Sequence, residues 1–271
     1  MSTENCILVC GIDATASAVA RRLFLQGYAV ALQQDAPPEI LRRGATFADA
    51  WFDGFASLEG VDARRARSSE EFLSTLRSGQ FIPILRQPFD HAVERWPWDA
   101  IVATKNSNAP SQLLSLAETT VGLGAGFVAG LDCDFAIEVD GPDPGAVVRA
   151  GPVPARRAIG ARDENFPRRE IPAVGSGVFR TGKAIGETVQ QGEVLGAVGG
   201  AILRAPVNGR IDGLLRNGRA VAHGATVAEI VDPNIPATGV SRRCELVARG
   251  VAFALEMEFE GWPLLSFEDW G

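Results

Sequence analysis

Residues 6–32 read CILVCGIDATASAVARRLFLQGYAVAL, and this stretch decides the fold of the first part of the chain. The apolar run at 6–11 ends in glycine, as a buried parallel strand often does before a turn. From Ala14 to Gln26 apolar side chains recur at helical spacing, and residues 28–32 are apolar again. A strand, a turn, a helix and a second strand in this order predict the start of a βαβ unit.

Further apolar runs predict more strands of the same sheet. They lie at 81–86, at 100–104, at a strand ending near Val121, and at 133–139. Helices are predicted beside them at 70–77 and 110–118. This alternation favours an open Rossmann-like α/β sheet with ligands bound at the carboxyl ends of its strands. We therefore predict a Rossmann-like α/β domain over residues 1–160.

The composition and periodicity of the sequence change near residue 150. Residues 151–172 are rich in Pro, Arg and Gly without periodicity, which predicts a linker or a long surface loop. Two copies of the pattern G-x-x-V-x-x-G-x-x-[LV]-x-x-[VI] follow, starting at Gly186 and Gly218. Because glycine at this density disfavours helix, each copy predicts a short strand, a tight turn and another short strand.

The repeat region, about 175–232, resembles the biotinyl/lipoyl carrier domain, a barrel-sandwich built from two interleaved halves. Carrier domains present a modified lysine on the hairpin between the halves, where this chain has Gly199 and Gly200. The resemblance implies an all-β barrel-sandwich domain over 172–234 that carries neither biotin nor lipoate. Helical spacing then returns in 241–257, which predicts a C-terminal helix and tail over 238–271.

The composition narrows the class of protein. The chain has 271 residues, of which 46% are hydrophobic, and a net charge of −7, which together predict a globular protein. The acidic balance argues against nucleic acid and anionic membranes as partners. The four cysteines and two histidines are not arranged at the spacing of metal ligands, so we predict no metal site. Without a signal pattern or a long apolar stretch, we expect a cytoplasmic protein.

The first strand–helix turn is where a dinucleotide phosphate binds in a Rossmann-like sheet. The three positions of its glycine fingerprint are Gly11, Asp13 and Ala16 in this chain. The side chain and negative charge of Asp13 oppose a pyrophosphate at the middle position. Gln34 stands near the end of the second strand, where an acidic residue that binds the ribose is expected. We therefore expect NAD(P) binding at this turn to be weakened.

Two further segments are candidates for ligand contacts. Lys105 and Asn106 follow a predicted strand directly, at the end where ligands bind, so the lysine is either an anion contact or a solvated loop residue. The loop with Gly122, Gly124 and Gly126 either cradles a phosphate with its backbone amides or forms a tight turn under close packing.

Paired arginines form a third candidate. Arg42 and Arg43 precede a cluster of aromatic residues, and they either clamp an anionic ligand or are solvated at the surface. No Ser/His/Asp grouping or paired carboxylate motif stands out in the sequence, so the catalytic residues stay unassigned.

Several segments share their order and spacing with one family. They are GIDATASAVARRL (11–23), PEILRRGATFADAWFDG (38–54), the run from Asp99 through Asn106, VGLGAGFVAGLDCDFAIE (121–138) and RAPVNGRIDGLLRNG (204–218). Over roughly residues 6 to 257 the chain resembles the selenium-dependent molybdenum hydroxylase system proteins, which are described as molybdenum cofactor maturation or hydroxylase accessory proteins.

The resemblance implies an accessory or maturation factor that handles a nucleotide or molybdopterin-type cofactor for a client molybdenum hydroxylase. Family members usually show GAGDLATG at the first turn. Of the glycines in that motif, this chain keeps only Gly11. Ala14 stands at the family aspartate, Gln34 at a usual glutamate, and Thr104 where a second lysine often precedes Lys105. These changes indicate a divergent member whose ligand differs or is lost.

Two alternative functions remain open from the sequence. One is a Rossmann-type NAD(P)-dependent oxidoreductase or another nucleotide-using enzyme at the same strand ends. The other is a non-catalytic adaptor that docks partners through its β part. The identity of the ligand, the presence of enzymatic activity, the client enzyme, the involvement of selenium and the number of subunits are not decided by the sequence.

Overall fold

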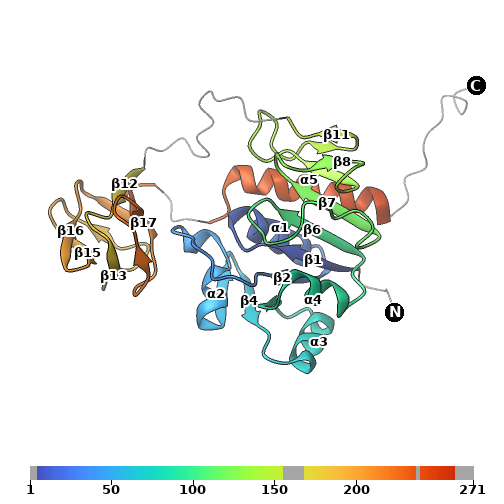
Figure 1. Ribbon diagram of the computed structural model, residues 1–271, viewed down its shortest axis with the longest axis horizontal. Coiled ribbons are helices and arrows are strands. Elements are labelled where there is room, and N and C mark those ends of the chain that lie inside the picture. Colours follow the sequence, from blue (N-terminus) through green and yellow to red (C-terminus); the bar gives the residue numbers. More distant parts are fainter. Residues whose placement is uncertain (1–4, 155–167, 236–238, 260–271) are drawn as a thin grey trace, which may run out of the picture.

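The computed structural model describes residues 5–154, 168–235 and 239–259 of the chain. It is a mixed α/β protein with a large sheet, flanking helices and a smaller β part to one side (Figure 1). The helices are α1 (Ala14–Leu25), η1 (Arg43–Ala45, a 3-10 turn), α2 (Ala48–Asp53), α3 (Ser69–Ser78), α4 (Phe89–Glu94) and α5 (Arg242–Phe259). No helix in these described ranges is long and apolar enough to cross a membrane.

The large sheet has nine strands in the order β10-β9-β7-β6-β1-β2-β5-β4-β3. Its strands are β1 (Cys6–Cys10), β2 (Ala29–Gln33), β3 (Phe55–Leu58), β4 (Val61–Arg65), β5 (Ile82–Leu85), β6 (Ala100–Thr104), β7 (Thr119–Leu123), β9 (Phe135–Ile137) and β10 (Val147–Val148). The strands from β9 to β4 run parallel, whereas β10 and β3 pair antiparallel at the two edges. A short pair, β8 (Val128–Ala129) with β11 (Gly151–Pro152), lies beside this sheet.

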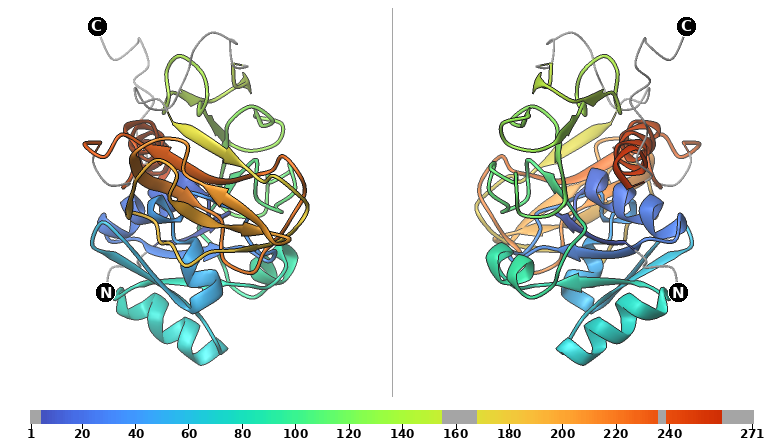
Figure 2. Two further views of the ribbon diagram at one scale, coloured as in Figure 1. Left: turned by 90° about the vertical axis from the view of Figure 1, so that its left-hand side faces the viewer. Right: turned by 90° about the vertical axis from the view of Figure 1, so that its right-hand side faces the viewer.

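Alternating side chains of the strands supply two apolar layers, one on each face of the sheet. In β1, Ile7 and Val9 belong to the core under α1 and α5, whereas Leu8 and Cys10 belong to the core under α3 and α4. This alternation is what a strand buried on both faces requires. Helix α5 lies beside α1 in both side views (Figure 2), so the C-terminal helix returns to the large sheet.

The small β part consists of two four-stranded sheets in the orders β12-β19-β17-β14 and β16-β15-β13-β18. Its strands are β12 (Arg169–Pro172), β13 (Gly177–Arg180), β14 (Thr188–Val189), β15 (Val194–Val198), β16 (Ala201–Arg204), β17 (Gly209–Leu214), β18 (Ala220–Val221) and β19 (Thr226–Val231). Apolar side chains from both sheets, including Phe179, Ile211 and Ile230, form one core between them.

The two sequence repeats form equivalent structures. The first gives β14 and β15, the second gives β18 and β19, and each repeat thereby contributes one strand to each sheet. Gly192 and Gly224 turn the chain between the two strands of each repeat, with φ of +85° and +80°. Their N–H groups donate to Ala205 and Ala173, at 2.8 and 2.9 Å. The prediction of strand, glycine turn and strand is therefore confirmed in both copies.

The helix predicted at 110–118 is wrong, because this segment consists of turns. Ser115 has φ of +72°, a left-handed conformation that a helix does not contain. The backbone N–H groups of Leu113 and Leu114 donate to the carbonyl of Asp132 instead of to a preceding turn. Bonds to a loop that is distant in sequence thus replace the helical ladder.

The segment predicted as a linker begins and ends in strands. Gly151–Pro152 forms β11, and Arg169–Pro172 forms β12, which pairs with β19. Residues 155–167 between them lie outside the described residues, as does the tail from 260 to 271. The predicted C-terminal helix is present as α5.

Candidate functional site

The strand order reverses between β1 and β6, and we call the region outside the carboxyl ends of these two strands the crevice. From β1 the chain continues to β2 on one side, whereas β6 lies on the other side of β1. Such a reversal of strand order leaves an opening outside the carboxyl ends of the two strands, where α/β sheets bind ligands. The candidate site is therefore built from the residues that follow β1, β2 and β6.

Gly11 occupies the turn after β1 in a conformation that requires glycine. Its φ is +107°, and a Cβ atom at this position would lie 2.6 Å from Oγ1 of Thr104. Its N–H donates to the carbonyl of Gln33 at the end of β2, at 2.9 Å. The first glycine of the fingerprint thus joins the ends of β1, β2 and β6 in close contact.

Asp13 caps helix α1 and also contacts the far side of the crevice. Its Oδ1 accepts the backbone N–H of Ala16 at 2.9 Å, which satisfies one of the open donors of the first turn. Its Oδ2 accepts the side-chain amide of Asn106 at 3.3 Å. A carboxylate therefore occupies the positive end of α1, the place where a phosphate binds in related sheets.

A second aspartate–asparagine pair runs in parallel with the first. Asn108 donates through Nδ2 to Oδ1 of Asp35, which lies two residues beyond β2. Asp13–Asn106 and Asp35–Asn108 together connect the segment after β6 to the turns after β1 and β2. We name these two hydrogen bonds the crevice latch. Neither Asp35 nor Asn108 was among the site residues predicted from the sequence.

Two buried polar atoms lie at the same strand ends. Oγ1 of Thr104 and Oε1 of Gln33 accept or donate no hydrogen bond within the described residues, although both side chains are buried. The amide Nε2 of Gln33 donates to the carbonyl of Gln87 at 2.8 Å. By strand alternation Thr104 lies on the face of Val102 and Gln33 on the opposite face with Ala31, so these two atoms do not form one site.

Lys105 is exposed directly after β6, and its side chain runs beside the glycine loop. A Cβ atom on Gly126 would lie 3.7 Å from Cδ of Lys105. Gly122 and Gly124 serve packing, since a Cβ at 122 would lie 2.2 Å from Phe127 and the N–H of Gly124 donates to Ile137 at 2.9 Å. The loop is thus a tight turn whose Gly126 end reaches the lysine.

Gln34 and the two arginines lie away from the latch. The carbonyl of Gln34 accepts the indole N–H of Trp51 at 2.8 Å, and its amide donates to Ala36. Arg43 donates to Asp49 at 2.6 Å, and Arg42 lies 3.8 Å from a carboxylate oxygen of Glu229. The structure therefore brings Gly11, Asp13, Lys105, Asn106 and Gly126 together and places Arg42 and Arg43 elsewhere.

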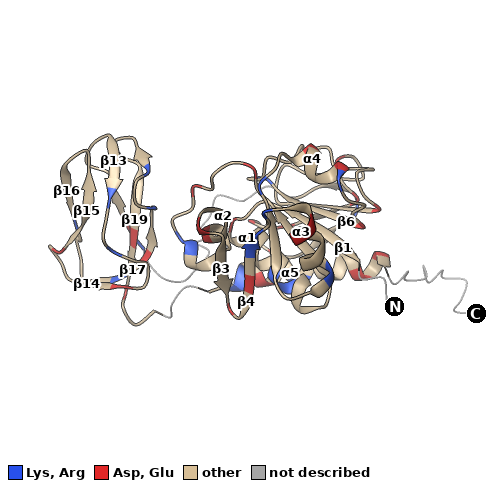
Figure 3. Ribbon diagram, turned by 90° about the horizontal axis from the view of Figure 1, so that it is seen from below, with Lys and Arg blue, Asp and Glu red and all other residues tan. Residues whose placement is uncertain are grey.

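The two arginines lie at the junction between the large sheet and the small β part, where charged segments of both parts face each other (Figure 3). Nε of Arg43 donates to the carbonyl of Leu214 in β17, at 3.2 Å. Arg216 donates to both carboxylate oxygens of Asp53 at 2.7 and 2.8 Å, and to Asp49 at 2.7 Å. These hydrogen bonds hold the pKa of Asp53 below its usual value.

Glu229 faces the same junction from β19. Oε2 of this carboxylate has no hydrogen-bond partner among the residues that the structure describes, and Arg42 and Arg168 are each 3.8 Å away. Burial raises the pKa of Glu229, with further upward contributions from Asp212 and Glu170, against the attraction of the two arginines. The ionised carboxylate is therefore less well accommodated in the folded chain than in water.

We expect the Glu229→Gln variant to be slightly more stable than the wild type at pH values above neutral. A raised folded-state pKa means that this carboxyl stabilises the fold fully below its ordinary pKa, and that the contribution is lost as pH rises through the raised value. The glutamine side chain does not ionise, so the variant does not lose this contribution as the pH rises. Urea unfolding of the variant and the wild type at about pH 5 and about pH 8 checks this prediction. A variant that is less stable than the wild type at the higher pH would contradict it.

Two cysteines near the sheet are unsuited to act as nucleophiles at neutral pH. Burial raises the pKa of the Cys10 thiol far above its usual range and that of Cys133 to about 11. Both thiols are therefore protonated under ordinary conditions, and only the thiolate is strongly nucleophilic.

No model of a known protein family matches the chain. The chain is similar to the uncharacterized protein YqeB of Escherichia coli strain K12, with 33% identity over 265 residues. The match covers 94% of this chain and 48% of YqeB, so the chain spans about half the length of the curated relative it matches. An aspartoacylase family protein of Mesorhizobium loti matches 68% of this chain and 55% of its own, with 12% identity and a TM-score of 0.23. That TM-score is too low to indicate a shared fold.

Proposed function

We propose that this protein is an accessory or maturation factor for a molybdenum hydroxylase and that it binds a nucleotide or molybdopterin-type ligand at the crevice between β1 and β6. The single observation that carries the ligand site is the crevice latch beside Lys105. The pathway rests on the chain-wide sequence resemblance to hydroxylase accessory proteins.

The proposed fold assignment supports this site. The parallel order β7-β6-β1-β2-β5 is that of a Rossmann-like sheet, which binds ligands where the strand order reverses. The strand exchange between the two repeats supports assigning the β part as a biotinyl/lipoyl-like barrel-sandwich. Its Lys183 is ion-paired with Glu187 and Glu193, at 3.3 and 2.6 Å, and stands before the first repeat. We therefore assign the β part a docking role.

The chemistry of the latch suits a ring with hydrogen-bond donors and an anionic tail. Asp13 and Asp35 are carboxylates that already accept from the amide groups of Asn106 and Asn108. A pterin or guanine ring has a ring N–H next to an amino group, and one carboxylate can accept hydrogen bonds from both. Lys105 would then meet the phosphate.

Substituting Lys105 tests the anion contact. Lys105→Ala is expected to weaken binding of GMP or pterin-6-carboxylate about tenfold, the scale of one charge-assisted hydrogen bond. Lys183→Ala is the matched control, because the chain has these two lysines alone and Lys183 is paired within the β part. Isothermal titration calorimetry on the purified chain gives both dissociation constants. Equal affinity in both variants would reject the contact.

Substituting Asp13 separates the proposed ligand from NAD(P). Asp13→Asn keeps an acceptor for the N–H of Ala16 and removes the charge, whereas Asp13→Gly also clears space at little cost to the helix cap. We expect both variants to lose affinity for a pterin or guanine ring. Tighter NADH or NADPH binding by these variants would instead favour an NAD(P)-dependent enzyme.

The pathway has its own test. Mass spectrometry of small molecules released from the purified protein is expected to identify a pterin or nucleotide. Deletion of the gene in its host is expected to lower the activity of a molybdenum hydroxylase, and expression of the wild-type chain should restore it. Unchanged hydroxylase activity in the deletion strain would reject the accessory role, whatever the ligand.

A further inference from the structure

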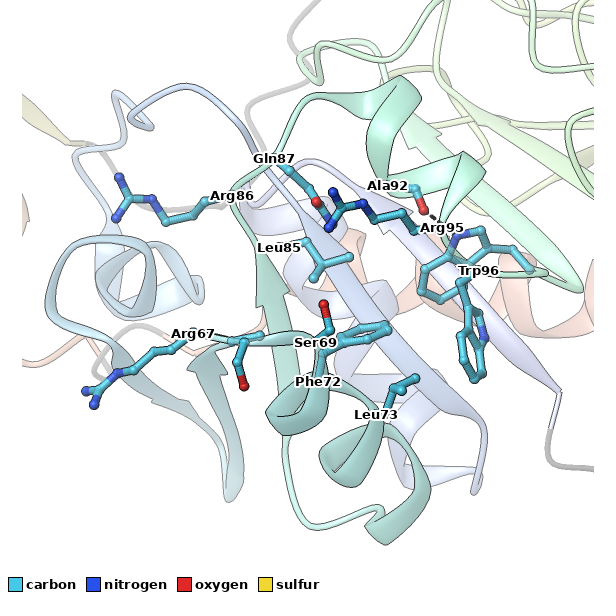
Figure 4. A pocket seen from close by; sticks show the side chains of 13 residues that line it. Arg67, Ser69, Phe72, Leu73, Leu85, Arg86, Gln87, Ala92, Arg95 and Trp96 are labelled. Carbon is cyan, nitrogen blue, oxygen red and sulfur yellow. Dashed lines mark hydrogen bonds between the residues drawn. The ribbon is translucent and has the colours of Figure 1, made fainter.

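A second pocket, of about 480 Å³, lies at the carboxyl ends of β4 and β5 between α3 and α4 (Figure 4). Its size falls within the range of roughly 300–1,000 Å³ that is typical of small-molecule sites. None of the residues that line it contributes to the crevice latch. The pocket therefore needs its own explanation.

Aromatic side chains form one wall of this pocket. The ring of Phe72 lies 6.2 Å from the rings of Trp96 and Trp98, with interplanar angles of 85° and 65°. The indole N–H of Trp98 donates to Ala92 at 2.9 Å, whereas the buried indole nitrogen of Trp96 has no partner within the described residues. The wall thus offers flat apolar surface, which suits a planar ring, whereas the Trp96 indole nitrogen is buried away from the cavity.

The polar groups around the pocket are basic. Arg67, Arg86 and Arg95 line it, and no aspartate or glutamate does, although the whole chain carries a net charge of −7. The guanidinium of Arg86 lies 3.9 Å from the ring centre of Trp51, which fixes it to one side. Figure 4 shows Arg95 extending over the pocket toward Gln87, between Arg86 and Trp96. Arg95 makes no hydrogen bond or ion pair within the described ranges, so its charge faces the pocket unneutralised.

The first turn of α3 carries two carboxylates, Glu70 and Glu71, beside the positive end of the helix. Ser68 caps this ten-residue helix by accepting the N–H of Glu71 at 3.1 Å, and Ser69 lines the pocket beside it. The Glu71 carboxylate accepts a hydrogen bond from the backbone N–H of Arg67 at 2.9 Å. These carboxylates offset the positive end of the helix, so Arg95 is the main positive group that faces the cavity from this side.

From these contacts we infer that the pocket binds a planar heteroaromatic ring that carries a phosphate. The ring lies against Phe72, Trp96 and Trp98, and the phosphate meets Arg95 and the first turn of α3. The carbonyl of Gln87, which accepts from Gln33, connects this pocket to the end of β2. The inference goes beyond the proposed function and does not depend on it.

Two matched ligand pairs test the pocket. We expect flavin mononucleotide and AMP to bind the full chain at least tenfold more tightly than riboflavin and adenosine, which have the same rings without phosphate. Arg95→Ala is expected to remove most of that difference. Arg77→Ala is the matched control, since Arg77 is exposed on α3 outside the pocket. Isothermal titration calorimetry measures all affinities.

Ser69→Glu provides a variant in which folding is preserved. A carboxylate in the first turn of a helix is stabilising, yet at this position it repels a phosphate in the pocket. We expect about a tenfold loss for both phosphorylated probes and little change for Ser69→Gln, which has the same size without charge.

The outcomes separate the two sites. If no probe binds, or if Arg95→Ala and Ser69→Glu bind flavin mononucleotide and AMP like the wild type, the inference is wrong. If Lys105→Ala removes binding and the pocket variants do not, the ligand occupies the crevice, which overturns the inference and leaves the proposed function standing. Binding lost in the pocket variants and kept in Lys105→Ala supports the pocket alone.

Discussion

Gly250→Ala is expected to lower the free energy of unfolding by about 2 kcal/mol, because a methyl group at this position collides with backbone. A Cβ atom on Gly250 would lie 2.1 Å from the carbonyl oxygen of Gly145 and 2.8 Å from its carbonyl carbon. Backbone cannot rotate away as a flexible side chain can. The helix α5 must therefore move off the loop after β9, against the intrinsic gain of about 1 kcal/mol that alanine brings to a helix.

The cost is large because α5 covers one face of the sheet. Val247, Val251 and Leu255 on this helix are buried in the core shared with α1. Urea unfolding measures the change, and Gly182→Ala is the matched control, since a methyl group there meets no atom within 4 Å. A Gly250→Ala protein as stable as the wild type would mean that α5 does not approach Gly145 this closely.

The sheet could be predicted where its signal is local. The stretch 6–32 encodes β1, α1 and β2 as two short apolar runs with a helical period between them, and their bounds agree with the predicted ranges to within about one residue. The glycine repeats were equally clear, because Gly192 and Gly224 each form the turn that their spacing requires. Periodicity and glycine placement act within a few residues, so a sequence reveals them.

Structure that depends on distant partners could not be predicted in this way. The segment 110–118 has helical spacing but is held by the carbonyl of Asp132, and nothing within the segment indicates that contact. Arg43 also donates to Leu214, and Arg216 donates to Asp53, across the junction and more than 160 residues away in sequence. Asp35 and Asn108 form half of the crevice latch, yet neither belongs to a motif.

Arg216→Glu is expected to release the small β part from the large sheet. Arg216 donates to Asp49 and Asp53 on α2, and its guanidinium lies 4.4 Å from the ring centre of Phe52. Reversing the charge removes these contacts and brings a third carboxylate next to two others. Because the site is partly exposed to solvent, we expect a loss of about 2 kcal/mol in docking free energy.

Small-angle X-ray scattering of the full chain checks the release as an increase in the radius of gyration, while circular dichroism shows whether both parts stay folded. Arg219→Glu is the matched control in the same β part, since Arg219 pairs with Glu39, whose side chain is 80% exposed. Exposed pairs contribute little, so this variant should scatter like the wild type. A radius of gyration that is unchanged in Arg216→Glu would contradict the role of this arginine.

The charge-swap variant Arg216→Glu with Asp53→Arg decides whether the ion pair itself holds the junction. The swapped pair restores opposite charges at the same two positions, although Asp49 then faces the new glutamate. Partial recovery of the wild-type radius of gyration is therefore expected, and raised salt should weaken it by screening. No recovery would mean that the packing of Arg216 on Phe52, together with the bond from the N–H of Leu214 to the carbonyl of Leu41, orients the β part instead.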